Sequence, residues 1–161
     1  IYPDMDLQED ARWKMTPPLR SAEDRAALIE GIKDGTIDMI ATDHAPHSIE
    51  EKSRGLKDSA MGIVGLETAF AALNTHLVRK GVISIERLIE LMSINPRKVF
   101  GIQGGLNVGD RADVVLLDLN KEWRVDSSKF FSMGKITMFD GKDMVGDVVM
   151  TIHRGEVVYK A

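Results

Sequence analysis

The chain has 161 residues, of which 43% are hydrophobic and 29% charged, and its formal net charge is −4. This composition argues against a disordered or membrane-spanning protein, because disordered chains are poor in hydrophobic residues and a spanning helix needs about 18 consecutive apolar residues. The acidic charge argues against nucleic acid or anionic lipid as the main partner, and the absence of cysteine excludes disulfides and thiolate metal sites.

The N-terminal part of the chain is predicted to contain a loop, a helix and a strand. Residues 1–20 are polar and rich in proline, which favours a loop. Ser21 is suited to cap a helix and Gly35 to end it, with apolar residues at helical spacing between them. Residues 37–42 form a short apolar run, which is typical of a buried strand in an α/β unit.

Helical patterns dominate the middle of the chain. A polar loop is expected over residues 48–60, followed by a helix over residues 64–80 that ends at Gly81. Ser84 is suited to cap the next helix. A short helix should begin at Asn95-Pro96 and end at Phe100-Gly101.

The character of the sequence changes after residue 101. Residues 113–118 form a β-rich run. Residues 148–152 and 157–159 form two further runs, and Gly155 between them predicts a hairpin turn. The last third of the chain is therefore expected to be mainly β.

The domain organisation follows from this change. Residues 1–101 are interpreted as α/β, and residues 102–161 as mainly β. The chain begins with Ile1 rather than methionine, which suggests a piece of a longer protein.

The most informative local pattern is Asp43-x-x-x-His47. It follows the predicted strand, and residues at the carboxyl ends of strands line the active sites of α/β sheets and barrels. Asp43 could hold a divalent metal or move a proton, and His47 could bind an anion or a metal. The alternative is an aspartate N-cap followed by a loop histidine. His44 is interpreted as structural, and these residues are too few for a closed metal site, which needs about four ligands.

Other polar residues carry weaker signals. The Thr16–Arg20 segment could present donors to a substrate, or it could be a rigid connector. The glycines of the Gly62–Glu67 segment could let backbone N–H groups receive an anion, with Glu67 as a first-turn acid. His76 and His153 are interpreted as surface or packing residues.

Three blocks occur in an order that resembles the C-terminal part of a bacterial-type dihydroorotase, within the amidohydrolase superfamily. They are Lys-Met-Thr-Pro-Pro-Leu-Arg at 14–20, Ile-Ala-Thr-Asp-His-Ala-Pro-His at 40–47, and Gly-Ile-Val-Gly-Leu-Glu-Thr-Ala at 62–69. Asn95-Pro96, Gly109-x-x-Ala112-Asp113 and the closing hairpin are similar to the tail of the wider superfamily. The resemblance extends over essentially the whole chain.

The resemblance implies an α/β fold, the C-terminal part of a distorted (β/α)₈ TIM barrel with part of a small β-sandwich. Residues 37–42 would be the eighth barrel strand. Residues 1–101 would hold the last strand and helices of the metal-dependent hydrolase barrel, and residues 102–161 the C-terminal segment of the sandwich. A whole barrel needs about 250 residues, so the metal-binding histidines of the family would come from earlier strands outside this chain.

The activity implied by the resemblance is the reversible, zinc-dependent cyclisation of N-carbamoyl-L-aspartate to L-dihydroorotate in pyrimidine biosynthesis. Asp43 would contact the one or two zinc ions and transfer the proton, and His47 would bind the substrate carboxylate. The backbone of Met61 and Gly62 would meet the pyrimidine edge. Thr16 stands at a substrate contact where the family usually has asparagine.

Two alternatives to this activity stay open. One is another cyclic amidohydrolase, similar to hydantoinase or allantoinase, and the other is an inactive subunit that scaffolds aspartate carbamoyltransferase. The expected partners are the small-molecule substrate, the upstream part of the same protein, and either a second copy or aspartate carbamoyltransferase. We expect a cytoplasmic protein without nucleic-acid or membrane partners, and a fragment that is inactive alone.

Overall fold

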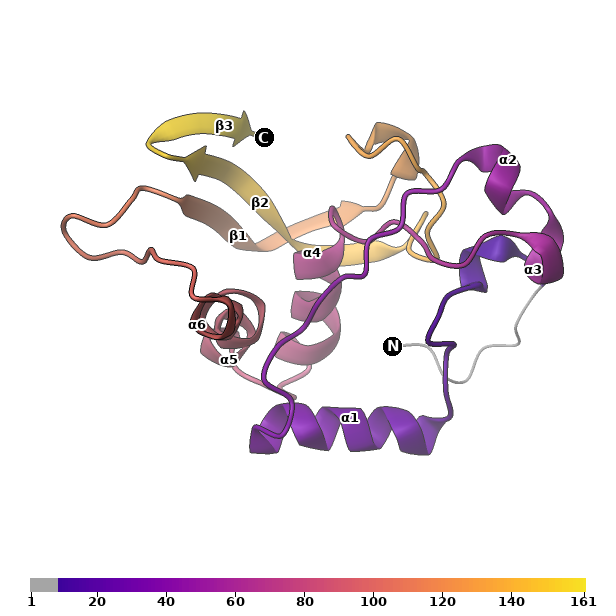
Figure 1. Ribbon diagram of the computed structural model, residues 1–161, viewed down its shortest axis with the longest axis horizontal. Helices are drawn as coiled ribbons and strands as arrows, with labels where there is room; N and C mark the ends of the chain where they lie inside the picture. Colours follow the sequence, from indigo (N-terminus) through magenta and orange to yellow (C-terminus); the bar gives the residue numbers. More distant parts are fainter. Residues whose placement is uncertain (1–8) are drawn as a thin grey trace. The chain divides into compact units, whose positions relative to one another are not determined.

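The structure is a computed structural model that describes residues 9–161 (Figure 1). The described chain divides into two compact units. The first unit contains residues 9–37, 41–69 and 124–143, and the second contains residues 38–40, 70–123 and 144–161. Residues 1–8 of the predicted N-terminal loop lie outside the described residues.

The first unit holds short helices joined by long connections. Its elements are η1 (Ala11–Trp13), α1 (Ala22–Asp34), α2 (Ile49–Lys52), α3 (Gly55–Asp58) and η4 (Ser127–Lys129). The prediction of a helix between Ser21 and Gly35 is confirmed, since Ser21 and Asp24 form a reciprocal capping box and Gly35 adopts a left-handed conformation.

The second unit holds most of the remaining helices and the sheet. Its elements are α4 (Ala69–Leu73), the π-helix η2 (Asn74–Val78), α5 (Ile85–Ile89), the π-helix η3 (Glu90–Ile94), α6 (Asn95–Phe100), β1 (Val114–Arg124), β2 (Asp143–His153) and β3 (Glu156–Lys160). The cap at Ser84 and the helix end at Gly101 are confirmed.

The three strands form one sheet in the order β1–β2–β3 (Figure 1). Strands β2 and β3 are antiparallel, with His153 paired to Glu156. The predicted hairpin is confirmed. Both turn residues, Arg154 and Gly155, have positive φ angles of 51° and 84°, as a two-residue type I′ turn requires.

The core of the second unit lies between its helices and sheet. Leu88, Leu91 and Met144 are almost completely buried. Asn74 is buried beside them, and its side-chain amide donates hydrogen bonds to the Leu119 carbonyl of β1 at 3.2 Å and to the Val145 carbonyl of β2 at 2.8 Å. A buried polar side chain therefore joins the helical layer to two strands.

Three sequence predictions are wrong in detail. Residues 37–42 form no strand in the described chain, because a strand is defined by its hydrogen-bonded neighbours and this segment has only isolated backbone bonds, such as the one from Ile40 to Leu91. The expected loop over residues 48–60 contains two helices, α2 and α3. The helix predicted over residues 64–80 begins only at Ala69.

Candidate functional site

Asp43 lies in the irregular segment that connects residue 40 to α2. Its φ angle is +47°, a left-handed conformation that non-glycine residues adopt infrequently. Its side chain is exposed, and it makes no hydrogen bond or ion pair with another described residue. Backbone strain at an unpaired, exposed carboxylate is typical of a functional position.

His44 is held by backbone groups of the following segment. Its Nδ1 accepts hydrogen bonds from the N–H groups of Gly65 at 3.1 Å and Leu66 at 3.3 Å. An accepting Nδ1 leaves the ring proton on Nε2, which lies 3.3 Å from the hydroxyl oxygen of Ser132. These contacts support the interpretation of His44 as structural.

Residues 131–134 pack against the segment that follows Asp43. The Glu67 carboxylate accepts hydrogen bonds from the N–H groups of Phe131 at 2.8 Å and Ser132 at 3.0 Å. Gly134 lies so close to Pro46 that a Cβ atom there would stand 2.7 Å from the Pro46 Cα atom. Glu67 was expected to act as a first-turn acid of a helix, but it precedes α4 and secures this second segment instead.

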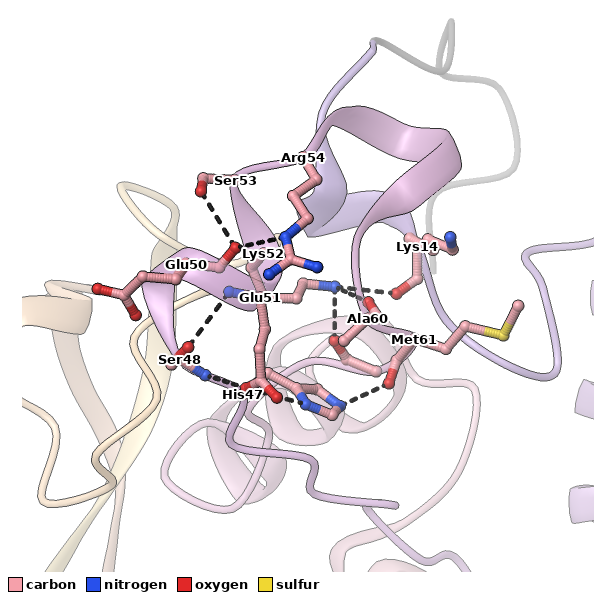
Figure 2. A network of polar contacts seen from close by, with 11 residues as sticks. Lys14, His47, Ser48, Glu50, Glu51, Lys52, Ser53, Arg54, Ala60 and Met61 are labelled. Carbon is pink, nitrogen blue, oxygen red and sulfur yellow. Dashed lines mark hydrogen bonds and ion pairs between the residues drawn. The ribbon is translucent and has the colours of Figure 1, made fainter.

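The two ring nitrogens of His47 contact two different neighbours. Its Nε2 lies 2.8 Å from the Met61 carbonyl oxygen, and Nδ1 lies 3.6 Å from the carboxylate of Glu51 (Figure 2). Because a carbonyl can only accept, Nε2 carries a proton. The Ser48 N–H, followed by the charge of His47, holds the pKa of the Glu51 carboxyl below its usual range.

Lys52 is buried although its side chain carries an ammonium group. It is only 4% exposed, and its Nζ donates to the carbonyl oxygens of Gly62 at 2.8 Å, Ala60 at 2.9 Å and Lys14 at 3.3 Å (Figure 2). Burial, followed by the charge of Lys14, lowers the pKa of Lys52. All three ammonium donors are satisfied by backbone carbonyls.

The four predicted substrate contacts, Thr16, His47, Met61 and Gly62, form one connected cluster. Thr16 donates a hydrogen bond from its hydroxyl to the Met61 sulfur, and the Met61 carbonyl accepts a hydrogen bond from His47 Nε2. Gly62 donates its N–H to the Lys14 carbonyl at 2.9 Å. Gly62 has a φ angle of +111°, and a Cβ atom there would lie 2.5 Å from the Ala45 Cβ, so only glycine fits.

A zinc ion would find one suitable ligand in this part of the chain. The exposed Asp43 carboxylate has no competing partner among the described residues, so it fits one ligand position. Residues 9–161 contain no group of three or more His, Cys, Asp or Glu side chains able to hold a metal. The remaining ligands of a zinc site would therefore have to come from outside the described residues.

A cavity of about 980 Å³ lies in the second unit. It is lined mainly by apolar side chains such as Leu88, Met92 and Val148. None of the predicted site residues lines it, so the candidate site rests on the geometry around Asp43 and His47.

No helix in the described part of the chain combines the length and apolar character that crossing a membrane demands.

The candidate site therefore contains Asp43 in a strained backbone conformation, followed by His47, in a segment that packs closely against Gly62. The sequence profile of the amidohydrolase family matches residues 10–158. The chain belongs to the amidohydrolase family. Dihydroorotases from Bacillus subtilis (strain 168) and Fusobacterium nucleatum are similar to this amidohydrolase chain, with 53% identity over 152 residues and 51% over 158 residues. These alignments cover 94% and 97% of the chain but only 36% and 37% of the relatives, so the chain spans about a third of their length.

Solved structures of the family have the same fold over this region. The L-hydantoinase (dihydropyrimidinase) from Arthrobacter aurescens matches the amidohydrolase chain with a TM-score of 0.84 and 42% identity. The match covers 91% of this chain and 34% of that structure. The dihydropyrimidinase from Brevibacillus agri NCHU1002 matches with a TM-score of 0.84 and 27% identity, covering 93% of this chain and 34% of that one.

Sequence reasoning missed two residues of the cluster, Glu51 and Lys52. The pattern Ser48-x-x-Glu51 is a capping-box signature, and it could have predicted the helix that carries both residues. The burial of Lys52 has no sequence signal, because lysine is among the residues least often buried.

Proposed function

We propose that the complete protein carrying this chain is a dihydroorotase. It would interconvert N-carbamoyl-L-aspartate and L-dihydroorotate in pyrimidine biosynthesis, in the cytoplasm. The observation that carries this proposal is the identity of about half of all aligned residues to curated dihydroorotases over nearly the whole chain. The chain would supply the C-terminal part of a (β/α)₈ barrel over residues 1–101 and part of a β-sandwich over residues 102–161.

Asp43 is the proposed catalytic residue and the proposed metal ligand of this chain. In the hydrolytic direction, water adds to the ring carbonyl carbon and the carbon–nitrogen bond breaks, so one proton must move from the water to the departing nitrogen. An exposed carboxylate without an internal partner is suited to accept that proton and then donate it. Bound zinc, with most ligands from elsewhere in the protein, would supply Lewis-acid polarisation of the carbonyl.

His47 and its neighbours are the proposed substrate-binding residues. The Nε2–H group of His47 donates a hydrogen bond to the Met61 carbonyl, and a substrate carboxylate would share that hydrogen bond or replace the carbonyl as its acceptor. Charge-assisted hydrogen bonds of this kind are about twice as strong as neutral ones. Thr16, Met61 and Gly62 surround this point and would contact the remaining polar edge of the substrate.

A hydantoinase-like activity is the second candidate. It is favoured by the 42% identity to the L-hydantoinase from Arthrobacter aurescens. The complete protein should be assayed with L-dihydroorotate, N-carbamoyl-L-aspartate and hydantoin, and its zinc content measured. Turnover of the first two compounds in preference to hydantoin is the expected result. Preference for hydantoin would replace the proposal, and absence of all turnover would favour a non-catalytic subunit, for example one that scaffolds aspartate carbamoyltransferase.

A further inference from the structure

Lys52 stands out because its ammonium group is buried and no carboxylate of the described residues lies within ion-pair distance, so that only the more distant charge of Asp10 favours the protonated form. An ammonium group loses hydration when it is buried, and this cost is normally offset by a carboxylate. Among the described residues Lys52 has no ion pair within 4 Å; its three contacts are backbone carbonyls. Such an arrangement fixes the backbone of the segments that provide those carbonyls.

The segments tied together by Lys52 are those proposed to bind substrate. The Ala60 and Gly62 carbonyls flank Met61, and the Lys14 carbonyl precedes Thr16 by two residues. The Gly62 N–H also donates to the Lys14 carbonyl, so the two segments are joined twice, once directly and once through the ammonium group.

Glu51, the residue before Lys52 on α2, contacts His47, the remaining proposed substrate-binding residue. Glu51 accepts the Ser48 N–H at 2.8 Å and faces His47 Nδ1, while His47 reaches Met61 on its other side. The single turn of α2 therefore contacts His47 through Glu51 and the Met61–Gly62 backbone through Lys52, while His47 and Met61 also contact each other directly. Figure 2 shows Lys52 pointing into the loop, whereas Glu50 of the same turn points away from it.

We propose that Lys52 is a positioning residue for substrate recognition, whose ammonium group holds the Lys14–Thr16 and Ala60–Gly62 segments in the arrangement that the substrate meets. This inference rests on the proposed function and deepens it. Removal of the ammonium group would leave three carbonyls without their donor, so the Met61–Gly62 backbone would shift relative to His47. Substrate affinity would suffer, whereas Asp43 makes no contact with Lys52 and metal binding would persist.

The test uses the complete protein and the variant Lys52→Met, which keeps the length of the side chain and removes the ammonium group. We expect KM for dihydroorotate to rise at least about tenfold with unchanged zinc content and a smaller change in kcat. Lys57→Met is the matched control, because Lys57 is exposed on α3 and its side chain has no described contact. It should leave KM unchanged.

A chemical rescue separates positioning from general stability. In Lys52→Cys, alkylation with 2-bromoethylamine rebuilds an ammonium group at nearly the original length, and treated wild-type protein is the control. KM should return toward the wild-type value after alkylation, at a temperature where thermal unfolding shows both forms to be folded. Unchanged KM in folded Lys52→Met, or an elevated KM that alkylation leaves unaltered, would overturn the inference. Inactive wild-type protein would refute the proposed function and this inference with it, whereas active wild-type protein with an insensitive Lys52 would refute the inference alone.

Discussion

Single residues of the candidate site differ in what surrounds them. Asp43 is exposed and strained, and His47 is engaged on both ring nitrogens. Lys52 is almost fully enclosed by carbonyls. The free carboxylate of Asp43 is suited to proton transfer, whereas the enclosed ammonium group of Lys52 is suited to fixing the backbone around it. Substitutions at these positions should therefore affect turnover and substrate binding differently.

Replacing Asp43 by asparagine should abolish proton transfer while preserving the fold. The two side chains are similar in size, and Asp43 has no described internal partner to lose. Loss of a general acid–base group typically lowers the rate by about 10²–10⁴-fold, and a weakened metal contact would lower it further. Turnover in both directions and bound zinc should be measured on the complete protein, and near-normal turnover would contradict the catalytic role.

Replacing His47 by alanine should weaken substrate binding. The change removes the Nε2–H donor that bonds the Met61 carbonyl and is proposed to bond the substrate carboxylate. KM should rise and zinc content should stay the same, because the residue is proposed to contact substrate and not metal. Zinc loss in this variant, measured against wild-type protein purified in parallel, would make His47 a metal ligand instead.

At the scale of elements, single polar side chains join neighbouring helices, strands and turns of the second unit. In the second unit Asn74 connects the helical layer to β1 and β2, and Asp113 connects the start of β1 to the turn of the β2–β3 hairpin. Both depend on hydrogen bonds to backbone groups, so each should be sensitive to loss of a single acceptor or donor.

The variant Asn74→Ala should reduce the free energy of unfolding by about 1–3 kcal/mol. It removes the amide donor from the Leu119 and Val145 carbonyls, although Val145 keeps the Thr75 hydroxyl as a second donor. Denaturant unfolding of the complete protein provides the measurement, with the exposed Asn120→Ala as control. Equal stability of the two variants would show that this bridge contributes little.

The variant Asp113→Asn should lose a pH-dependent contribution to stability. The backbone N–H of Arg154, followed by the Arg111 guanidinium, lowers the pKa of Asp113. A lowered folded-state pKa stabilises the fold above the unfolded-state pKa of about 3.9, and this contribution is lost as the pH falls through the folded-state value. The Tm deficit of the variant relative to the wild-type protein should narrow below about pH 4, where the Asp113 carboxyl becomes protonated; a deficit that does not narrow there would contradict the assignment.

The whole chain exposes apolar side chains that a complete protein would be expected to cover. Phe100 is 70% exposed, Leu106 84% and Phe131 83%. Residues 37–42 also lack the neighbouring strands that a barrel would supply. Exposed apolar surface favours association with another chain or segment.

Residues 1–161 alone should therefore be unstable or should aggregate, and should fold only together with the rest of the protein. Size-exclusion chromatography and thermal unfolding of the purified chain test this expectation, with the complete protein as control. A monomer with one cooperative unfolding transition would contradict it.

The sequence by itself determined the local features and the family. Caps at Ser21 and Ser84, the glycine stop at Gly35 and the Arg154-Gly155 turn depend on residues close together in the chain, and the structure confirms them. Only the tertiary structure decided that Lys52 is buried against Lys14, Ala60 and Gly62, because these contacts join residues up to 38 positions apart. Strand formation at residues 37–42 depends on neighbours in the same way, since a strand exists only when other backbone pairs with it, and an apolar run cannot specify whether that backbone is present.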